Sequence, residues 1–317
     1  MSTLVKISAI GIASLDIIFE VDSYPHETGY AIVRNSVQLP GGTTANSAVA
    51  AHRLGADVAL TTVIGRGAEG DTLANMLEFE GLSMKSVSRD PIRETDVTTL
   101  IVSRASHDTT IFWKQGARPQ RGMKIDVDTL FGADTCLIDV DDLDLYRFLV
   151  DLPVHTRPGA TLLGTLTYLD RDSVLTEEIL ARVDAVVGSS RDARALLHAC
   201  SDQDAARQFQ HLMVGSNLRL AVITAGEDGA LGITRDQIWH AHAAKVSPVD
   251  TTGAGDAFAG AMAIMLAMRS PIDESLRFSS VVAGLATAAI GAQTALPTEQ
   301  MVHEFMRRSP PAVERMS

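Results

Sequence analysis

The segment that most restricts the fold is a glycine-rich turn followed by an apolar run. Residues 250–258 read DTTGAGDAF, and the apolar run continues to 266. Glycines let a backbone approach a ligand closely, and the first turn of a helix offers unpaired N–H groups that suit an anion. An acid beside such a turn can accept a proton while the amides stabilise a phosphoryl group. The turn therefore favours phosphoryl-transfer chemistry. The structural alternative is an ordinary helix start with Asp256 in its first turn.

A second glycine motif lies in the N-terminal part of the chain, where residues 41–55 read GGTTANSAVAAHRLG. Gly41 and Gly42 permit close backbone approach, and the Asn46 amide offers both hydrogen-bond donors and an acceptor. The small residues that follow let a helix pack closely. The pattern is typical of a binding loop that leads into a helix. A glycine turn with Asn46 as helix N-cap is the structural alternative.

Apolar strand-like segments alternate with helical segments along most of the chain. Strands are expected at 4–11, 58–64, 135–140, 160–166, 185–187 and 218–224, and helices at 46–54, 71–80, 201–214 and 273–290. This alternation predicts an α/β fold with a doubly wound, mostly parallel sheet flanked by helices.

Two stretches break this alternation. Strands are expected at 17–21 and 31–39 without a helix between them, and a hairpin at 98–102 and 109–114. Their alternating polar and apolar residues are typical of a sheet with one solvated face. They predict a small β-sheet lid, formed by insertions at about 15–40 and 96–117 in a single domain that spans 1–317. The Pro-rich tail after residue 307 is expected to be loose.

Composition excludes several classes of protein. Of the 317 residues, 46% are hydrophobic, enough for a large core, and the net charge of −12 comes without a basic cluster, which argues against nucleic-acid binding. No apolar run is long enough to span a membrane. Two cysteines, Cys136 and Cys200, fit a reduced, cytoplasmic protein.

The two glycine motifs together resemble the signatures of the ribokinase-like (PfkB) family of small-molecule kinases, and the resemblance runs from about residue 4 to 295. It implies a ribokinase-like fold and ATP-dependent transfer of the γ-phosphoryl group to a hydroxymethyl group of a ribose- or fructose-like sugar. ATP and Mg²⁺ are the implied cofactors. In the family the acid of the second signature is the catalytic base. That makes Asp256 the base, with the amides of Gly253, Ala254 and Gly255 as the anion hole.

The resemblance also implies where the sugar binds. Asp16, Gly41, Gly42, Thr43 and Asn46 match its substrate-binding positions, although Thr43 stands where many sugar kinases of this group have Asn or Lys. Arg118, close to Lys114, could contact an anionic substrate or the phosphoryl group. A solvated, exposed charge is the favoured alternative for Arg118.

At the nucleotide end, the resemblance assigns Thr224, Gly226 and Gly229 to a turn beside the ATP phosphates. It places Ser280 at the adenine pocket and Ser190 among the ATP-binding residues. Ser189 and Asp192 replace the Asn and Glu that many members carry; Asp192 could still hold Mg²⁺ through water. This variant and the segment 21–25 resemble the ketohexokinase branch.

A further loop matches a monovalent-cation site that some members have, which would bind K⁺. The matching residues are Asp250, Thr252, Ala286, Ala289 and Gly291. A structural loop without an ion is an equal alternative.

Other functions stay open. A nucleoside kinase of the same fold is the nearest alternative, and a non-catalytic sugar sensor would explain the departures at 189 and 192. The string Gly65-x-Gly67-x-x-Gly70, with Asp90 downstream, formally matches the dinucleotide fingerprint of an NAD(P) oxidoreductase. The open face of the lid could pair two copies into a homodimer, although edge strands can also be blunted without pairing.

Overall fold

The computed structural model describes residues 4–106, 109–139, 160–166 and 178–316, together with 145, 147 and 149. Within them a ten-stranded sheet has the order β14-β13-β12-β11-β10-β9-β8-β1-β4-β5. Neighbours from β5 to β11 pair in parallel, and those from β11 to β14 pair antiparallel. The strands are β1 (Lys6–Gly11), β4 (Asp57–Gly65), β5 (Val87–Asp90), β8 (Thr135–Asp139), β9 (Thr161–Thr165), β10 (Ala185–Ser189), β11 (Leu220–Thr224), β12 (Ala230–Ile233), β13 (Ile238–Ala241) and β14 (Val313–Met316).

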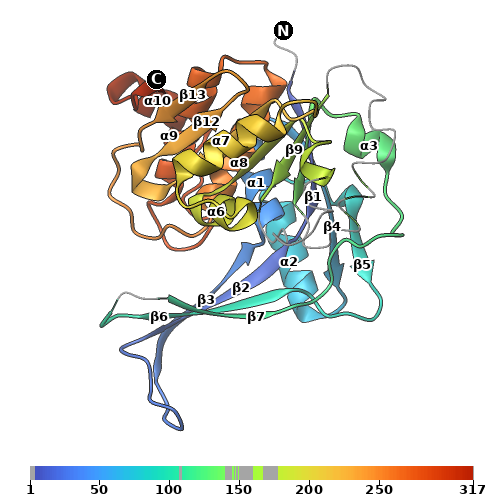
Figure 1. The fold of residues 1–317 in the computed structure, drawn as a ribbon. Coiled ribbons are helices and arrows are strands. Elements are labelled where there is room, and N and C mark those ends of the chain that lie inside the picture. Colours follow the sequence, from blue (N-terminus) through green and yellow to red (C-terminus); the bar gives the residue numbers. More distant parts are fainter. Residues whose placement is uncertain are drawn as a thin grey trace.

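Helices cover both faces of this large sheet (Figure 1). One apolar core joins it to α1, α2, α8 and α9, and a second joins it to α3, α6 and α7. Along β1, Ile7 and Ala9 enter the first core and Ile10 the second, which is the alternation of a strand buried on both faces. The helices are α1 (Thr43–Arg53), α2 (Ala68–Phe79), α3 (Val127–Phe131), α6 (Ser190–Leu197), α7 (Asp202–Leu212), α8 (Ala254–Ala267), α9 (Ile272–Ala286) and α10 (Glu299–Arg308).

A second, four-stranded sheet with the order β3-β2-β6-β7 extends away from the large one (Figure 1). Its strands β2 and β6 are parallel, and the outer pairs are antiparallel. The expected hairpin is confirmed as β6 and β7. The bounds are β2 (Ser14–Val21), β3 (Val33–Gly41), β6 (Val97–Ser103) and β7 (Thr109–Lys114).

The doubly wound, mostly parallel sheet with a small second sheet is confirmed, and the differences are local. Helix α1 begins at Thr43 with Gly42 as its N-cap, so Asn46 lies inside the helix and does not cap it. The prediction of a loose tail is wrong, because β14 adds to the edge of the large sheet beside β13. The expected strand at 135–140 is β8, and Val140 lies outside the described residues.

Candidate active site

The carboxylate of Asp256 meets the amide of Asn46 across the interface between α8 and α1. Asn46 Nδ2 donates a hydrogen bond of 2.7 Å to Asp256 Oδ2, and Ser47 Oγ donates one of 2.9 Å to the Asp256 carbonyl. The small side chains of α1 and α8 allow this approach: a Cβ at Gly260 would stand 2.4 Å from the Ser47 carbonyl oxygen. The two glycine-rich motifs of the sequence therefore form one site.

The environment of Asp256 suits a general base. Burial raises the pKa of Asp256 to about 7, with smaller upward contributions from the charges of Asp139 and Asp16, and the hydrogen bond from Asn46 opposes them. A base with a pKa near the working pH is effective because it is largely ionised and still basic enough to take a proton.

The N-terminal turn of α8 forms the backbone part of the site. Gly253 caps the helix with φ 76°, and a Cβ there would stand 2.5 Å from the Ala292 Cβ. The space beside the Gly255 Cα is open, because a Cβ there would meet no other described part of the chain within 4 Å. Ala254 N donates to the Thr251 carbonyl at 3.2 Å. Of the three amides expected in the anion hole, that of Ala254 is thus engaged within the turn, and there is open space on the side of Gly255 where a side chain would stand.

Asp16 lies on β2 where the small sheet joins the large one. It is 9% exposed, and a Cβ at Gly41 would stand 2.2 Å from Asp16 Oδ2. Burial raises the pKa of Asp16 to about 6, against hydrogen bonds from Ser14 and Thr98. Gly41 is therefore glycine because the Asp16 carboxyl fills the space of its side chain. The Thr43 hydroxyl is buried and faces Asp139, where it opposes the rise that burial causes in the pKa of that carboxyl.

Arg118 is buried, which contradicts the favoured expectation of a solvated charge. Its side chain is 9% exposed and pairs with the fully buried Asp96 at 2.8 Å, and its guanidinium stacks over Trp113 at 5.1 Å. Trp113 Nε1 also donates to Asp96, at 2.6 Å. Arg118 is buried because Asp96 and the indole ring together replace the water it would otherwise need. Lys114, in contrast, is exposed and pairs with Glu94.

This ion pair is connected to Asp16 through the small sheet. Asp16 is paired with Thr98, and Thr98 with Trp113, so the three side chains share one face. The charge of Asp96 adds to the raised pKa of Asp16.

The expected cation loop is closed around Asp250. The Asp250 carboxylate accepts hydrogen bonds from Thr252 N (2.9 Å), Thr252 Oγ1 (2.7 Å) and Gly291 N (2.8 Å). Ala286 ends α9, and Ala289 follows it. These hydrogen bonds link the segment before α8 to the loop after α9, beside the Gly253 turn.

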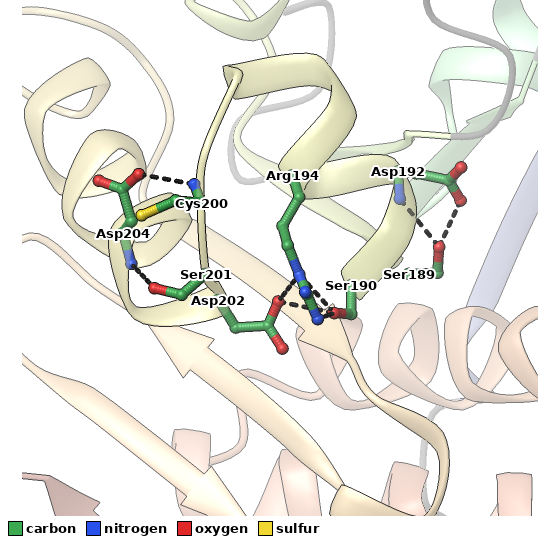
Figure 2. Close-up of polar contacts among 8 residues, drawn as sticks. All are labelled: Ser189, Ser190, Asp192, Arg194, Cys200, Ser201, Asp202 and Asp204. Carbon is green, nitrogen blue, oxygen red and sulfur yellow. Dashed lines mark hydrogen bonds and ion pairs between the residues drawn. The ribbon is translucent and has the colours of Figure 1, made fainter.

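Among the residues expected to bind the nucleotide, Ser189 caps the N-terminus of α6 with its side chain (Figure 2). Ser189 Oγ accepts from Asp192 N at 3.1 Å and donates to Asp192 Oδ2 at 2.6 Å. The other oxygen of Asp192 lies 3.9 Å from the guanidinium of the exposed Arg191. Ser190 is held differently: its hydroxyl donates to Asp202 at 2.6 Å, and Arg194 contacts both groups. The second Asp192 oxygen is thus only loosely engaged, while the Ser190 hydroxyl is bound to α7.

Three of the remaining residues expected to bind the nucleotide lie where β11 ends, and the fourth lies on α9. Thr224, the last residue of β11, donates to the Gly188 carbonyl at 3.3 Å. Gly226 begins the 3₁₀ turn η2 (Gly226–Asp228) with φ 59°, and Gly229 follows the turn with φ 89°. A Cβ at Gly229 would stand 2.0 Å from the Ala241 carbonyl oxygen. Ser280 lies on α9 and is 7% exposed.

Metal ligation can be assessed from the carboxylates. In the described part of the chain, no three His, Cys, Asp or Glu side chains gather closely enough to hold a metal ion. A single carboxylate such as Asp192 fits an ion that keeps most of its water shell, as Mg²⁺ does.

None of the helices described is long and apolar enough to cross a membrane.

Comparison with known proteins decides which family this site represents. The pfkB family carbohydrate kinase model matches residues 5–299. The chain belongs to the pfkB family of carbohydrate kinases. It is 28% identical over 317 residues to a ribokinase of Bacillus subtilis strain 168, covering 95% of this chain and 99% of that protein. It is 26% identical over 306 residues to a deoxyribokinase of Salmonella typhi, covering 95% and 98%.

A solved structure agrees with these relatives in fold. The structure of Arabidopsis thaliana ribokinase complexed with ribose and ATP has a TM-score of 0.85 at 18% identity, covering 96% of this chain and 99% of that one. As a pfkB-family member, this protein is an ATP-dependent sugar kinase with a ribokinase fold.

Two glycines of the string that matches the dinucleotide fingerprint, Gly65 and Gly70, have a packing role in this pfkB-family kinase. A Cβ at Gly65 would stand 2.2 Å from Thr95 N, and one at Gly70 would stand 2.2 Å from the Gly65 carbonyl oxygen. Arg89 donates to that same carbonyl at 2.8 Å. The glycines therefore make room for the protein's own backbone and for Arg89.

Four residues of the site were not found by reasoning from the sequence: Asp96, Trp113, Asp139 and Gln293. Asp139 ends β8, is 1% exposed, and accepts from Thr165 Oγ1 at 2.7 Å. An acid at the end of an apolar strand was the available signal for Asp139, since ligands bind at the carboxyl ends of parallel strands. Gln293 carried no such signal, because it lies in a loop.

Proposed function

We propose that this kinase transfers the γ-phosphoryl group of ATP to the hydroxymethyl group of a ribose-like furanose, with Asp256 as the general base. The observation that carries the proposal is the Asp256 carboxylate, held at 2.7 Å by Asn46 and seated in the first turn of α8. Similarity to a ribokinase and a deoxyribokinase favours a pentose over a hexose such as fructose.

The sugar would bind between Asp16, Asn46 and Asp256. Carboxylates and amides suit vicinal hydroxyls because each can take part in more than one hydrogen bond. The carboxyl ends of β1, β8 and β9 lie at this edge of the sheet, which is where ligands bind in α/β folds. Asp256 takes the proton of the hydroxymethyl group, whose oxygen then attacks the γ-phosphoryl group in line.

Positioning and charge stabilisation supply most of the catalysis in phosphoryl transfer. The amides at the start of α8, where the space beside the Gly255 Cα is open, would receive the growing negative charge. The Thr224 turn with Gly226 and Gly229, together with Ser280, would hold the nucleotide. Asp192 would bind Mg²⁺ through the water shell of the ion and so hold its positive charge beside the ATP phosphates.

The Asp250 loop would set the geometry of that anion hole. Its bonds to Thr252 and Gly291 already brace the Gly253 turn. A monovalent cation such as K⁺, held by carbonyls around 286–291, would brace it further. Activity measured in Na⁺, K⁺ and Cs⁺ chlorides at equal ionic strength tests this, since a loop without an ion gives equal rates.

The small sheet would close over the sugar as a lid and pair with a second copy in a homodimer. On the Asp16 face, the row Val37, Ile18, Leu100 and Ile111 is apolar, and Val37 (38%) and Ile111 (61%) are exposed. Ile18 and Leu100 are already buried in the monomer, so a second copy that covered the exposed Val37 and Ile111 side chains would remove their apolar surface from water. Sedimentation of the Ile111→Lys variant should show a monomer where the wild type is dimeric.

A nucleoside kinase of the same fold is the alternative acceptor class. Release of ADP measured with ribose, deoxyribose, fructose, adenosine and cytidine separates the two. Ribose or deoxyribose should give the highest kcat/KM, and a nucleoside as the best acceptor would overturn the proposal.

A further inference from the structure

A buried hydrogen-bond chain leads to Asp256 from a loop that the proposed chemistry does not use. Gln293 Nε2 donates to Asn46 Oδ1 at 2.8 Å, and Asn46 Nδ2 donates to Asp256 Oδ2 at 2.7 Å. Gln293 is 2% exposed and Asn46 is 4% exposed. The chain is therefore shielded from water at Gln293 and Asn46, where hydrogen bonds act most strongly on one another, and it ends at the half-buried Asp256.

The direction of this chain follows from the chemistry of the amide. A side-chain amide accepts at its oxygen and donates at its nitrogen. Because Gln293 donates to Oδ1, the Asn46 amide turns its nitrogen toward Asp256. If Asn46 were free to rotate by half a turn, its oxygen would face the Asp256 carboxylate and repel it. Gln293 thus selects the orientation that favours an ionised Asp256.

Gln293 is itself fixed in place by Arg53. Arg53 NH1 donates to the Gln293 carbonyl at 2.9 Å and to the Leu296 carbonyl at 3.0 Å, and its guanidinium forms two hydrogen bonds with Glu80, of 2.9 and 2.7 Å. Asn46 and Arg53 are seven residues apart on α1, which places them on one face of the helix. One face of α1 therefore binds the backbone of Gln293 through Arg53 and the side chain of Gln293 through Asn46.

We propose that Gln293 is a positioning residue for phosphoryl transfer: it orients the Asn46 amide, which in turn holds the Asp256 carboxylate. The proposal rests on the proposed role of Asp256 as base. Two other ionisable groups act on Asp256, namely Asp139 at the end of β8 and Asp16 on β2, and Gln293 contacts neither in the described structure.

A structural role alone does not explain a glutamine here. Gln293 Oε1 is buried and accepts no hydrogen bond from any described group. A buried acceptor without a partner lowers stability, and an apolar side chain of similar length would avoid that cost. Gln293→Met removes this unpaired acceptor but leaves Asn46 Oδ1 without its donor, so the two effects oppose each other and the variant should still fold.

The experiment compares Gln293→Met, Gln293→Glu and the control Gln210→Met. Gln210 is half-buried and also donates through Nε2, to the Thr234 carbonyl at 3.0 Å, away from the site. Gln293→Met should lower kcat about tenfold, because a misplaced base loses rate steeply. The KM for MgATP should change less than about threefold, since the hydrogen-bond chain from Gln293 ends at Asn46 and Asp256 and does not include the residues proposed to hold the nucleotide. The acid limb of kcat/KM should move to higher pH, and Gln210→Met should leave it unchanged.

Gln293→Glu keeps the shape of the side chain and replaces its donor with a carboxylate. At pH 8 this carboxylate would attract the Asn46 nitrogen away from Asp256, so kcat should fall further than in Gln293→Met. Gln293→Glu also serves as the test if Gln293→Met fails to fold by circular dichroism. Wild-type kcat and an unmoved acid limb in either folded variant would overturn the proposal.

A second readout does not need activity. Carboxyl ¹³C NMR of aspartate-labelled protein, assigned with Asp256→Asn, follows the Asp256 titration directly. In Gln293→Met this titration should move to higher pH than in the wild type, and an unchanged titration would refute the role of Gln293. If the wild type phosphorylates no sugar, the proposed function fails while this titration still tests the hydrogen-bond chain.

Discussion

Asn46 donates to Asp256 at 2.7 Å, and this single hydrogen bond joins two glycine-rich motifs that lie 210 residues apart in sequence. It links the helix that follows the Gly41–Gly42 turn to the helix that starts at Gly253. The groups needed for binding a hydroxyl, removing its proton and stabilising a phosphoryl group therefore meet where α1 and α8 pack.

The first prediction concerns pH. Asp256 must be ionised to take a proton, and burial raises its pKa to about 7, so kcat/KM should fall as pH drops through about 7. The charge of Asp139 contributes to the raised pKa of Asp256. Asp139→Asn should therefore move the acid limb to lower pH, as measured by kcat/KM from pH 5 to 9. If the acid limb of kcat/KM in Asp139→Asn stays at the same pH or moves to higher pH, the charge of Asp139 does not raise the pKa of Asp256.

The second prediction concerns stability. The pKa of Asp256 is higher in the folded protein than in the unfolded chain, so its contribution to stability is present at low pH and is lost as pH rises from about 4 through about 7. Above about pH 7 the buried, ionised carboxylate of Asp256 therefore lowers the free energy of unfolding. Asp256→Asn removes this charge, so Tm at pH 8 should rise by about 2–4 °C for each kcal/mol of stability gained.

The gain from Asp256→Asn should shrink toward pH 5, where Asp256 is largely protonated in the folded wild type. Calorimetry at both pH values measures the difference. An equal change in Tm at pH 5 and pH 8 would show that the carboxylate carries no such cost.

The third prediction concerns the buried ion pair of Arg118 and Asp96. Arg118→Met should destabilise the protein by about 3–5 kcal/mol, because it leaves the fully buried Asp96 without its partner. The double variant with Asp96→Asn should recover much of this loss. Urea unfolding measures both.

The exposed pair Lys114–Glu94 is the matched control for that experiment, and Lys114→Met should lower the free energy of unfolding far less than Arg118→Met does, because water screens exposed charges. Similar losses in Arg118→Met and Lys114→Met would mean that burial does not decide the strength of the Arg118 pair.

The fourth prediction concerns Asp192. Asp192→Asn should raise the KM for MgATP and leave the KM for the sugar unchanged, because the carboxylate would hold the hydrated ion. Asp204 provides the control, since it occupies the same capping position on α7 and accepts from Cys200 N at 3.0 Å (Figure 2). Asp204→Asn should not change either KM, and equal effects of both variants would assign Asp192 to capping alone.

Much of the fold followed from local patterns. The strand–helix alternation predicted the parallel sheet, and the polar–apolar alternation predicted the small sheet, because each pattern reflects which faces are buried. Tail strand β14 was missed, since its pairing with β13 is a long-range contact that the four residues Val313–Met316 do not signal.

The site was predictable where glycines and an acid were adjacent in sequence, as around Asp256. It was not predictable where function depends on tertiary contacts. Arg118 reads as an ordinary surface charge until Asp96 and Trp113 surround it. Gln293 reads as a loop residue until Arg53 places it against Asn46.

The most direct test of the account is ADP release by the wild type and by Asp256→Asn, each saturated with ribose and MgATP at pH 8. The exposed Asp236→Asn serves as control. Asp256→Asn should lose about a hundredfold or more in kcat, the usual scale for a general base, while calorimetry still detects ribose binding. Turnover within a few-fold of the wild type in Asp256→Asn would contradict the central claim that Asp256 takes the proton.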